Sequence, residues 1–554
     1  MDVHSPPQPT LPVPHAHCPT VFNACFNQSQ VGGTPADNGN RGRIIDVSIK
    51  EPVSVMELDK MDENDWKYHG EGNKSLVVSH VQLSRVLRLL KYPAEDSENP
   101  PQTVEQAFRQ IQNIVDFSSN VMSSLLGEKF IHSGEVVKLP LEFVRQLSIK
   151  VQHQRPAWRC DKVMDIYSGC ALCLPNLTSP PLHQPTHTPP LCIEIKPKCG
   201  FLPSSKHVSK DIKAKVCRFC MHQHYKVANG KWKRRSLYCP LDLFSGNRQR
   251  MHFAIRHLIE EPQNNFKIFK SGQCIYSSKE GSDELMDLNS LLHQLRPYFL
   301  HGINRINSHM TNKAVLNEFI QVLVNALLGG GGDEGVVTDR QGEGRSFCEA
   351  SLFNKERIRN GSQCLPSDSV LFRILQTQML DTLDIEGLYP LYRRVEQYMQ
   401  DFPKERTHLQ IDGPYNEAFL EKLQKSLAED DGSVEYAVAK VHQYRVAMTA
   451  KDCSIMIALV PRTEEEDDDE GLPSQRRLRD FMSSRPPAFS YSVSILDLDP
   501  KPFDSITSQL RLDQKIVSCY LRTGGALPKG SLPPLPDIFA AAEREDCTLL
   551  LHSM

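Results

Sequence analysis

The stretch Leu191-Cys192-Ile193-Glu194-Ile195-Lys196-Pro197-Lys198 places an apolar run directly before two lysines that flank a proline. The run 191–195 predicts a strand. Pro197 has a fixed φ and favours extended geometry in its neighbours, so we expect Lys196 and Lys198 to project to the same side. Two ammonium groups on one side repel each other unless an anion bridges them. The stretch therefore predicts an anion site, and a solvated strand edge is the alternative.

Basic residues crowd the segment that begins here. Residues 194–270 hold 17 Lys and Arg against five Asp and Glu, a net charge of +12, whereas the whole 554-residue chain has a formal charge of −3. A cationic segment on an otherwise acidic protein concentrates anions and speeds their arrival. The partner should be densely negative: a polyphosphate, a nucleic acid or an acidic membrane.

The composition is that of a soluble globular protein, with 40% apolar and 24% charged residues, and the length predicts two or more lobes. No run of 18 apolar residues is present, and the N-terminus lacks the charged start and apolar core of a signal peptide. Sixteen scattered cysteines indicate reduced thiols. With the basic cluster at 231–235, these features lead us to expect a protein of the cytoplasm and nucleus with no membrane partner. We also expect a monomer.

Composition and periodicity divide the chain into ordered and loose parts. Residues 1–55, rich in Pro, His, Asn and Gly, are expected to be disordered. Short apolar runs predict a β-hairpin over 66–92, and the Thr103–Gln106 capping box predicts a helix that ends at Gly127. Further expectations are helices over 313–328 and 374–400, a helix or strand over 441–446, strands over 453–460 and 491–498, a linker over 176–190, and flexible loops over about 329–348, 462–476 and 523–541.

A glycine-containing turn, Gly70-Glu71-Gly72-Asn73-Lys74-Ser75, separates two of these strands. Glycines let backbone amides approach phosphates closely, and a Gly-rich hairpin over ATP is typical of kinase-like folds. An ordinary tight turn is the alternative. The next strand supplies Arg85, Arg88 and Lys91, of which Arg88 is the candidate phosphate contact because its apolar neighbours indicate that the opposite face is buried. The sequence has neither a Walker P-loop nor the protein-kinase triplets His-Arg-Asp and Asp-Phe-Gly.

Four potential metal ligands fall within 23 residues, in the pattern Cys217-x2-Cys220-x3-His224-x14-Cys239. Two close cysteines followed by two further nitrogen or sulfur ligands suit tetrahedral zinc. His222 competes with His224 as the fourth ligand. Four protein ligands leave no open position, so we expect a structural zinc ion, and reduced thiols without metal are the alternative.

Carboxylates flank two predicted apolar strands. Lys451-Asp452-Cys453-Ser454 leads into one strand, and Leu496-Asp497-Leu498-Asp499-Pro500-Lys501-Pro502 closes another. Carboxylates in such places need a partner, and magnesium is suitable because it takes hard oxygen ligands and bridges phosphates. Asp497 and Asp499 should share one side of the strand, with Lys501 following on that side. Turn capping is the alternative for each Asp.

Taken together, these motifs resemble the inositol-pentakisphosphate 2-kinase family. The resemblance runs from about Met56 to His552. It is carried by Gly70-Glu71-Gly72-Asn73, Glu194-Ile195-Lys196-Pro197-Lys198-Cys199-Gly200-Phe201, Arg218-Phe219-Cys220-Met221-His222-Gln223, Cys239-Pro240-Leu241-Asp242-Leu243-Phe244-Ser245-Gly246, Pro262-Gln263-Asn264-Asn265-Phe266 and Thr449-Ala450-Lys451-Asp452-Cys453-Ser454-Ile455-Met456.

The resemblance implies ATP-dependent, magnesium-assisted phosphorylation of the 2-hydroxyl of inositol 1,3,4,5,6-pentakisphosphate to give phytate. It also implies an α+β, two-lobed, kinase-like fold similar to the inositol polyphosphate kinases. The N-lobe would span 56–190 and the C-lobe 191–552, with a largely helical inositide-binding insert near 214–375.

Roles for individual residues follow from the same resemblance. The turn Gly70–Ser75 and Arg88 would meet the ATP phosphates, and Glu194 would lie near the nucleotide. Asp452 would orient or deprotonate the 2-hydroxyl, and Asp497 would be the principal magnesium ligand. The substrate and the transferred phosphate would be lined by Arg155, Lys196, Lys198, Arg218, His222, Lys226, Asn264, Asn265, Lys267 and Lys501.

The sequence also departs from the family pattern. Ser505 and Gln509 stand where some members have basic and aromatic substrate contacts, so we expect a different pocket rim. The Cys-x-x-Cys zinc site of plant-type members is missing, because residues 390–410 contain no Cys.

Two other functions are compatible with parts of the sequence. The first is a zinc-containing nucleic-acid-binding protein, favoured by the basic segment Trp232-Lys233-Arg234-Arg235. That function would leave Asp452 and Asp497 without a role, and the segment lacks regularly interleaved aromatic residues for base stacking. The second is a scaffold that keeps the fold without catalysis.

Overall fold

The structure is a computed structural model that describes residues 61–96, 101–180, 188–281, 284–299, 311–329, 365–424, 429–461 and 489–523. All of them belong to one compact unit spanning 46–554. The disorder predicted for 1–55 lies outside the described residues, as do nearly all residues of the loops predicted near 329–348, 462–476 and 523–541. No helix within the described ranges is long and apolar enough to cross a membrane.

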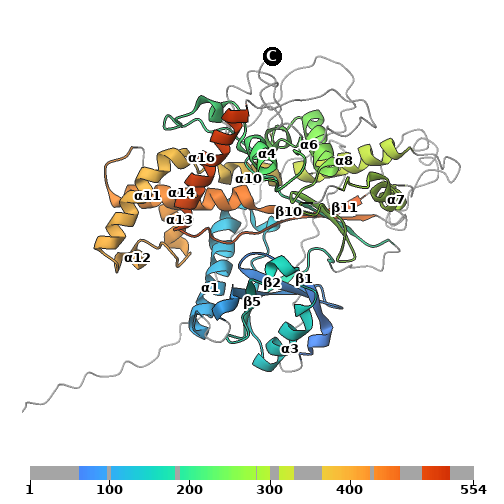
Figure 1. Ribbon diagram of the computed structural model, residues 1–554, viewed down its shortest axis with the longest axis horizontal. Helices are drawn as coiled ribbons and strands as arrows, with labels where there is room; N and C mark the ends of the chain where they lie inside the picture. The colour runs from blue at the N-terminus through green and yellow to red at the C-terminus, as the bar shows by residue number, and fades with distance from the viewer. Residues whose placement is uncertain are drawn as a thin grey trace, which may run out of the picture. The chain divides into compact units, whose positions relative to one another are not determined.

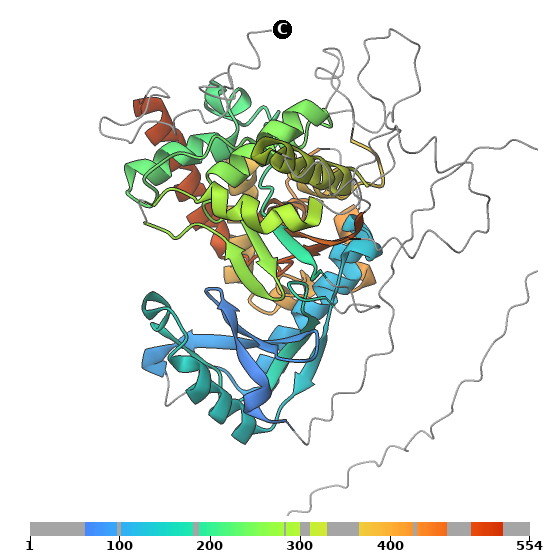
Figure 2. The same ribbon diagram turned by 90° about the vertical axis from the view of Figure 1, so that its right-hand side faces the viewer.

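The first of two antiparallel sheets contains the predicted hairpin. β1 (Trp66–Glu71), β2 (Ser75–His80) and β3 (Arg85–Pro93) pair in order, followed by β6 (Cys170–Pro175) and β4 (Glu135–Lys138), while β5 (Lys162–Met164) pairs with β3. One face of this sheet packs on α3 (Leu141–Gln152). Trp66 and Leu76 from the strands share a core with Phe143 and Leu147 of that helix. Figure 2 shows these strands in blue and teal with α3 against them.

A long helical segment leads away from this sheet. α1 (Val104–Asp116) begins at the predicted capping box, in which Thr103 and Gln106 cap each other reciprocally. It passes through a π-helical turn (Phe117–Met122) into α2 (Ser123–Leu126), and the helix ends at Gly127 with φ +98°, as predicted. The π-helical turn contacts α13 (Glu417–Gln424), and α2 contacts α10 (Val370–Gln378). Figure 1 shows α1 rising from β5 towards α14.

The second sheet is assembled from strands far apart in sequence. Its order is β11 (Phe489–Leu496), β10 (Ser454–Pro461), β7 (Leu191–Ile195), β8 (Phe266–Lys270) and β9 (Gln273–Tyr276), with every neighbouring pair antiparallel. β7 alternates as a strand should: Ile193 and Ile195 face the main core, and Cys192 packs with Met456 on the other side. The α+β fold class is thereby confirmed.

Helices cover this second sheet and extend beyond it. The main core includes residues from α4 (Arg218–Ala228), α6 (Arg248–Glu260), α7 (Leu288–Phe299) and α8 (Asn312–Leu328). The predicted helix over 313–328 is therefore confirmed as α8, which stops at Gly329 with φ +84°. The remaining short elements are η2 (Glu63–Asp65), η3 (Ala94–Asp96), η5 (Glu128–Phe130), η6 (Ala157–Arg159), η7 (Asp211–Ala214), α5 (Pro240–Leu243) and α12 (Glu405–His408).

A separate helical core lies beside the second sheet. α11 (Asp384–Asp401), α14 (Val434–Asp452) and α16 (Ser505–Thr523) share it, and Figure 1 shows them side by side in orange and red. The single helix predicted over 374–400 is wrong, because residues 379–383 interrupt it between α10 and α11. Residues 441–446, left open as helix or strand, are helical within α14.

Strand register determines where the charged residues meet. Ile195 pairs with Ile455, and Ser454 pairs with Leu496. The end of β7, the start of β10 and the end of β11 therefore lie at one edge of the sheet. Residues 196–198, 452–454 and 497–501 follow or precede these strands, so they converge there.

Candidate active site

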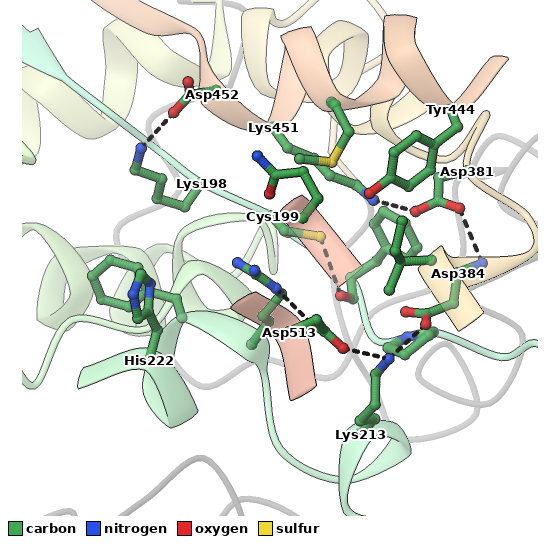
Figure 3. A pocket seen from close by; sticks show the side chains of 18 of the residues that line it. Lys198, Cys199, Lys213, His222, Asp381, Asp384, Tyr444, Lys451, Asp452 and Asp513 are labelled. Atoms are coloured by element: carbon green, nitrogen blue, oxygen red, sulfur yellow. Dashed lines mark hydrogen bonds and ion pairs between the residues drawn. The ribbon is translucent and has the colours of Figure 1, made fainter. Parts of the chain in front are cut away.

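A cavity of about 770 Å³ opens beside this edge. That volume suits a small molecule rather than a polymer groove. Figure 3 shows its wall, with Lys198 and Asp452 at one side and His222 on a neighbouring helix. The sequence-predicted residues that line it are Lys198, Arg218, His222, Lys226, Asn264, Asp452 and Lys501, together with the expected rim residues Ser505 and Gln509.

Two lysines converge on Asp452, the last residue of α14. Lys198 Nζ donates to one carboxylate oxygen at 2.9 Å, and Lys501 Nζ donates to the other at 2.7 Å. Burial opposes ionisation of Asp452, but the two lysines outweigh it and hold the pKa of this carboxyl well below its usual range. Asp452 is therefore ionised at neutral pH, and its side chain remains 53% exposed.

Asp497 forms the centre of a second ionic cluster, directly after β11. Lys196 Nζ donates to it at 2.5 Å, and the Ser454 hydroxyl donates at 2.8 Å. The same lysine lies 3.6 Å from Glu194. Burial opposes ionisation of Asp497, but Lys196 and Ser454 keep its pKa low. A further cation, Lys267 of β8, lies 3.4 Å from Glu194, so this cluster rather than the cavity wall holds Lys267.

The extended geometry predicted around two of these residues is wrong. Lys198 has φ +61°, and Asp497 has φ +62°. The strands end at Ile195 and Leu496, one or more residues earlier, so strict alternation of sides stops there. Left-handed backbone turns Lys198 towards Asp452 and Asp497 towards Lys196.

An ion pair joins the first sheet to the residues after β11. Arg88 of β3 holds Asp499 with both guanidinium nitrogens, one of them at 2.7 Å, and its Nε donates to Ser75 at 2.8 Å. Ser75 closes the predicted glycine turn. Arg88 therefore lies beside that turn as expected, while Asp499 is a partner that sequence analysis did not assign.

Arg155 lies outside the cavity. Its guanidinium binds Glu71 through two hydrogen bonds of 2.9 Å, and its remaining donors reach Gln152 and the carbonyls of Arg159 and Lys162. Lys91 pairs with the same glutamate. The Arg155, Glu71 and Lys91 side chains are at most 2% exposed. Arg155, assigned to the substrate, and Glu71, assigned to the nucleotide, therefore bind each other and do not line the cavity.

One face of α4 presents three predicted substrate residues to the cavity: Arg218, His222 and Lys226. Their spacing of four residues places them on one helical stripe. Lys226 donates to the Gln263 amide at 3.2 Å, and burial together with the charges of Lys198 and Lys231 lowers its pKa to about 7. Burial and the neighbouring cations likewise lower the pKa of His222 to about 3.

The two predicted asparagines have different surroundings. Asn264 lines the cavity, whereas Asn265 is 2% exposed and exchanges hydrogen bonds with the Lys196 backbone.

Sequence analysis missed several charged residues of the cavity wall, above all Lys231, which follows α4 and adds to the same cationic side. The others are Lys213, Asp381, Asp384, Arg445 and Asp513, and Lys451 of the predicted Lys451–Ser454 motif also lines the cavity.

Three cysteines of the predicted zinc site come together. Cys217 Sγ lies 3.1 Å from Cys220 Sγ and 3.8 Å from Cys239 Sγ, too far for disulfides. Among the described residues, these three thiols form the group whose sulfurs all lie within 4.8 Å, and His224 is outside that group. Its Nε2 lies 2.6 Å from Arg235 Nη1, and its ring packs edge-on against Tyr520.

The fold and this site define a phosphate-handling enzyme: an α+β protein whose cavity gathers cations around an ionised carboxylate. A model of the family described as inositol-pentakisphosphate 2-kinase matches residues 68–515. The chain belongs to the inositol-pentakisphosphate 2-kinase family.

Named relatives support this membership. An inositol-pentakisphosphate 2-kinase of Danio rerio is 59% identical over 503 residues, which cover 90% of this chain and 100% of that protein. The enzyme of the same name from Oryza sativa subsp. indica is 29% identical over 491 residues, covering 84% and 96% of the two chains. That of Arabidopsis thaliana is 29% identical over 496 residues, covering 84% and 95%.

Proposed function

We propose that this protein transfers the γ-phosphate of ATP to the 2-hydroxyl of inositol 1,3,4,5,6-pentakisphosphate, giving inositol hexakisphosphate. Membership of the family and the 59% identical relative support this reaction. The structural observation that carries it is the convergence of Lys198 and Lys501 on Asp452 beside a cavity whose wall also holds Arg218 and Lys226.

The cavity matches the charge of such a substrate. Five phosphates bring many negative charges, and the stripe on α4 adds three nitrogen-bearing side chains to Lys198 and Lys501. Each charge-assisted hydrogen bond contributes roughly 1.5–3 kcal/mol. The hydrogen bond of Lys226 goes to an amide rather than a carboxylate, which leaves its charge available to a phosphate.

Asp452 acts in this proposal as the group that orients the 2-hydroxyl. Its lowered pKa makes it a weak base but keeps it ionised, so it accepts a hydrogen bond from the hydroxyl throughout. Phosphoryl transfer needs alignment and charge neutralisation more than early proton removal. Lys198 and Lys501 hold the carboxylate and lie where the transferred phosphate would arrive.

The nucleotide would lie between the glycine turn and the cluster of Asp497. Arg88 and Lys74 would contact its phosphates, in a two-lobed arrangement like that of other kinases. Asp497 and Asp499 supply carboxylate oxygens, the hard ligands that fit magnesium, and magnesium would neutralise and bridge the phosphates. Lys196 and Arg88 now hold these carboxylates, so nucleotide binding would redistribute their contacts.

The three thiols would bind a structural zinc ion. Ligand sulfurs about 2.3 Å from zinc in a tetrahedron lie about 3.8 Å apart, which matches the separation of Cys217 and Cys239, whereas Cys217 and Cys220, at 3.1 Å, would have to move apart. Cys217 caps α4 and Cys239 caps α5, so zinc would tie together the starts of two helices. The first of these carries the cationic stripe. Among the described residues, the group of possible ligands that contains Cys217, all within 4.8 Å of one another, consists of these three thiols, without a fourth ligand.

Product analysis tests the reaction. The purified chain is incubated with ATP, magnesium and a panel of inositol phosphates that differ in which hydroxyls are free. We expect the pentakisphosphate with a free 2-hydroxyl to be converted to the hexakisphosphate, and pentakisphosphates already phosphorylated at position 2 to remain. Conversion of none of them would support a scaffold that has lost catalysis.

We also propose that the protein is a monomer and that it is found in the cytoplasm and the nucleus.

A further inference from the structure

We infer that Gln378 is a positioning residue, whose side-chain amide fixes the two segments that carry Lys198 and Asp452. This inference rests on the proposed function, in which those two residues align the hydroxyl and the transferred phosphate. Gln378 is the last residue of α10, and it is fully buried. It carries no charge and does not line the cavity.

Three hydrogen bonds satisfy both donors of the Gln378 amide and one lone pair of its oxygen. Its oxygen accepts from the Gly200 backbone N–H at 2.9 Å. Its nitrogen donates to the carbonyls of Lys198 at 2.8 Å and Ala450 at 3.1 Å. These partners lie 178, 180 and 72 residues away in sequence, so one side chain on α10 joins two distant segments, 198–200 and the end of α14. A buried amide whose donors are both satisfied holds its surroundings rigidly.

The first consequence concerns Lys198. Its φ of +61° is a sparsely populated conformation for a residue with a side chain, and it persists only where the surroundings determine it. Gln378 forms hydrogen bonds on both sides of this bend: it donates to the Lys198 carbonyl and accepts from the Gly200 N–H. Gly200 itself is tightly seated, since a Cβ there would lie 2.4 Å from the Phe244 ring. The amide therefore fixes the backbone from which the Lys198 side chain projects.

The second consequence concerns Asp452. The carbonyl of Ala450 lies in the last turn of α14, where carbonyls lack partners within the helix. Gln378 supplies such a partner for the Ala450 carbonyl, which also accepts from the Cys453 thiol at 3.2 Å. Three residues after Gln378, Asp381 pairs with Lys451 at 2.6 Å, as Figure 3 shows. The end of α10 and the residues that follow it thus hold the last turn of α14 at two successive residues, Ala450 and Lys451, directly before Asp452.

The test compares variants of one helix in the full-length chain. Gln378→Met keeps the length and removes all three hydrogen bonds, while Gln378→Glu keeps the acceptor for Gly200. The matched control is Gln376→Met, two residues earlier on α10, because Gln376 makes no side-chain hydrogen bond to the described part of the chain. We expect Gln378→Met to lower kcat at least tenfold and to raise KM for the inositol phosphate by less than that factor. The reason is that Arg218, Lys226 and Lys501 hold the substrate without help from Gln378.

A double-mutant cycle separates positioning from general support of the fold. If Gln378 acts through Lys198, the Lys198→Ala/Gln378→Met variant should lose less kcat than the product of the two single losses. Gln378→Glu sets a carboxylate oxygen against the carbonyls of Lys198 and Ala450, so it should lose at least as much kcat as Gln378→Met. Losses that multiply, or a kcat per folded molecule within twofold of wild type in Gln378→Met, would overturn the inference. If Gln378→Met does not fold, Gln378→Asn, which keeps an uncharged amide but shortens its reach, replaces it in the same cycle.

Asp452→Ala, measured in parallel, distinguishes two kinds of failure. If Asp452→Ala is inactive while Gln378→Met keeps the kcat of wild type, only the positioning role of Gln378 is excluded. An active Asp452→Ala would remove the proposed role of Asp452, and with it the basis of the inference.

Discussion

Arg88 and Asp499 lie 411 residues apart in sequence and form a two-pronged ion pair between the first sheet and the segment after β11. Arg88 also contacts Ser75, the residue that closes the glycine turn. The pair therefore joins the proposed nucleotide turn to the proposed magnesium ligands. Its geometry depends on the planar guanidinium, because an ammonium group cannot make two parallel hydrogen bonds to a carboxylate.

Arg88→Lys should weaken ATP binding at least tenfold and leave binding of the inositol phosphate within twofold of wild type. Lysine keeps the charge but loses the contact to Ser75 or to one carboxylate oxygen. Titration calorimetry with each ligand separately measures both effects. Arg85→Lys, on the same strand and 3.9 Å from Glu135, is the matched control and should change neither. Unchanged ATP affinity in Arg88→Lys would exclude Arg88 from the nucleotide site.

Lys226 should take up a proton when the substrate binds. Burial and neighbouring cations lower its pKa to about 7, and phosphates placed beside it would raise the pKa. Substrate affinity should therefore fall as the pH rises from below 7 towards the pKa of the bound state. Calorimetry in buffers of different ionisation enthalpy should show up to one proton fewer taken up by Lys226→Met than by wild type. Lys440→Met, whose lysine also has a pKa lowered by burial but lies outside the cavity, should behave as wild type.

Zinc should be present at about one ion per chain. Elemental analysis of freshly purified protein measures it, and Cys217→Ser/Cys220→Ser should remove it. Cys170→Ser/Cys173→Ser is the control, because these cysteines have the same spacing but lie on β6 and pack into two different cores. If freshly purified wild-type protein contains no zinc, the proposed zinc site is wrong and the three thiols form a metal-free cluster.

Arg155→Met should destabilise the protein rather than weaken substrate binding. Removing Arg155 leaves buried Glu71 with one charged partner among the described residues, Lys91, and breaking a buried ion pair costs about 3 kcal/mol of unfolding free energy. Denaturant unfolding measures the loss, and calorimetry should show unchanged affinity for the inositol phosphate. Arg159→Met, which removes a guanidinium that stacks on the exposed Trp158, should have little effect on either. Weakened substrate affinity in folded Arg155→Met would restore Arg155 to the substrate site.

Local signals in the sequence predicted much of the fold. The capping box at Thr103, the stop at Gly329 and the strand at 191–195 depend on neighbouring residues, and all three were found where expected. The break between α10 and α11 was missed because residues 379–383 contain neither Gly nor Pro to mark it. The π-helical turn after α1 likewise has no local signal.

Long-range contacts explain the gaps in the candidate site. The partnership of Arg88 with Asp499 and the burial of Arg155 on Glu71 depend on how distant segments meet, which spacing alone does not reveal. Gln378 is a neutral residue of a predicted helix, so no charge or motif pointed to it. One available signal was overlooked: Arg218, His222 and Lys226 are each four residues apart, which places them on one helical face.

The most direct measurement compares turnover and substrate binding in Asp452→Ala. Lys198 and Lys501 remain in this variant, as does the stripe on α4, so the cationic wall should still hold inositol pentakisphosphate. We expect an affinity within about fivefold of wild type by calorimetry, and a kcat at least a thousandfold lower, since the hydroxyl loses the carboxylate that orients it. Turnover close to that of wild type would contradict the account.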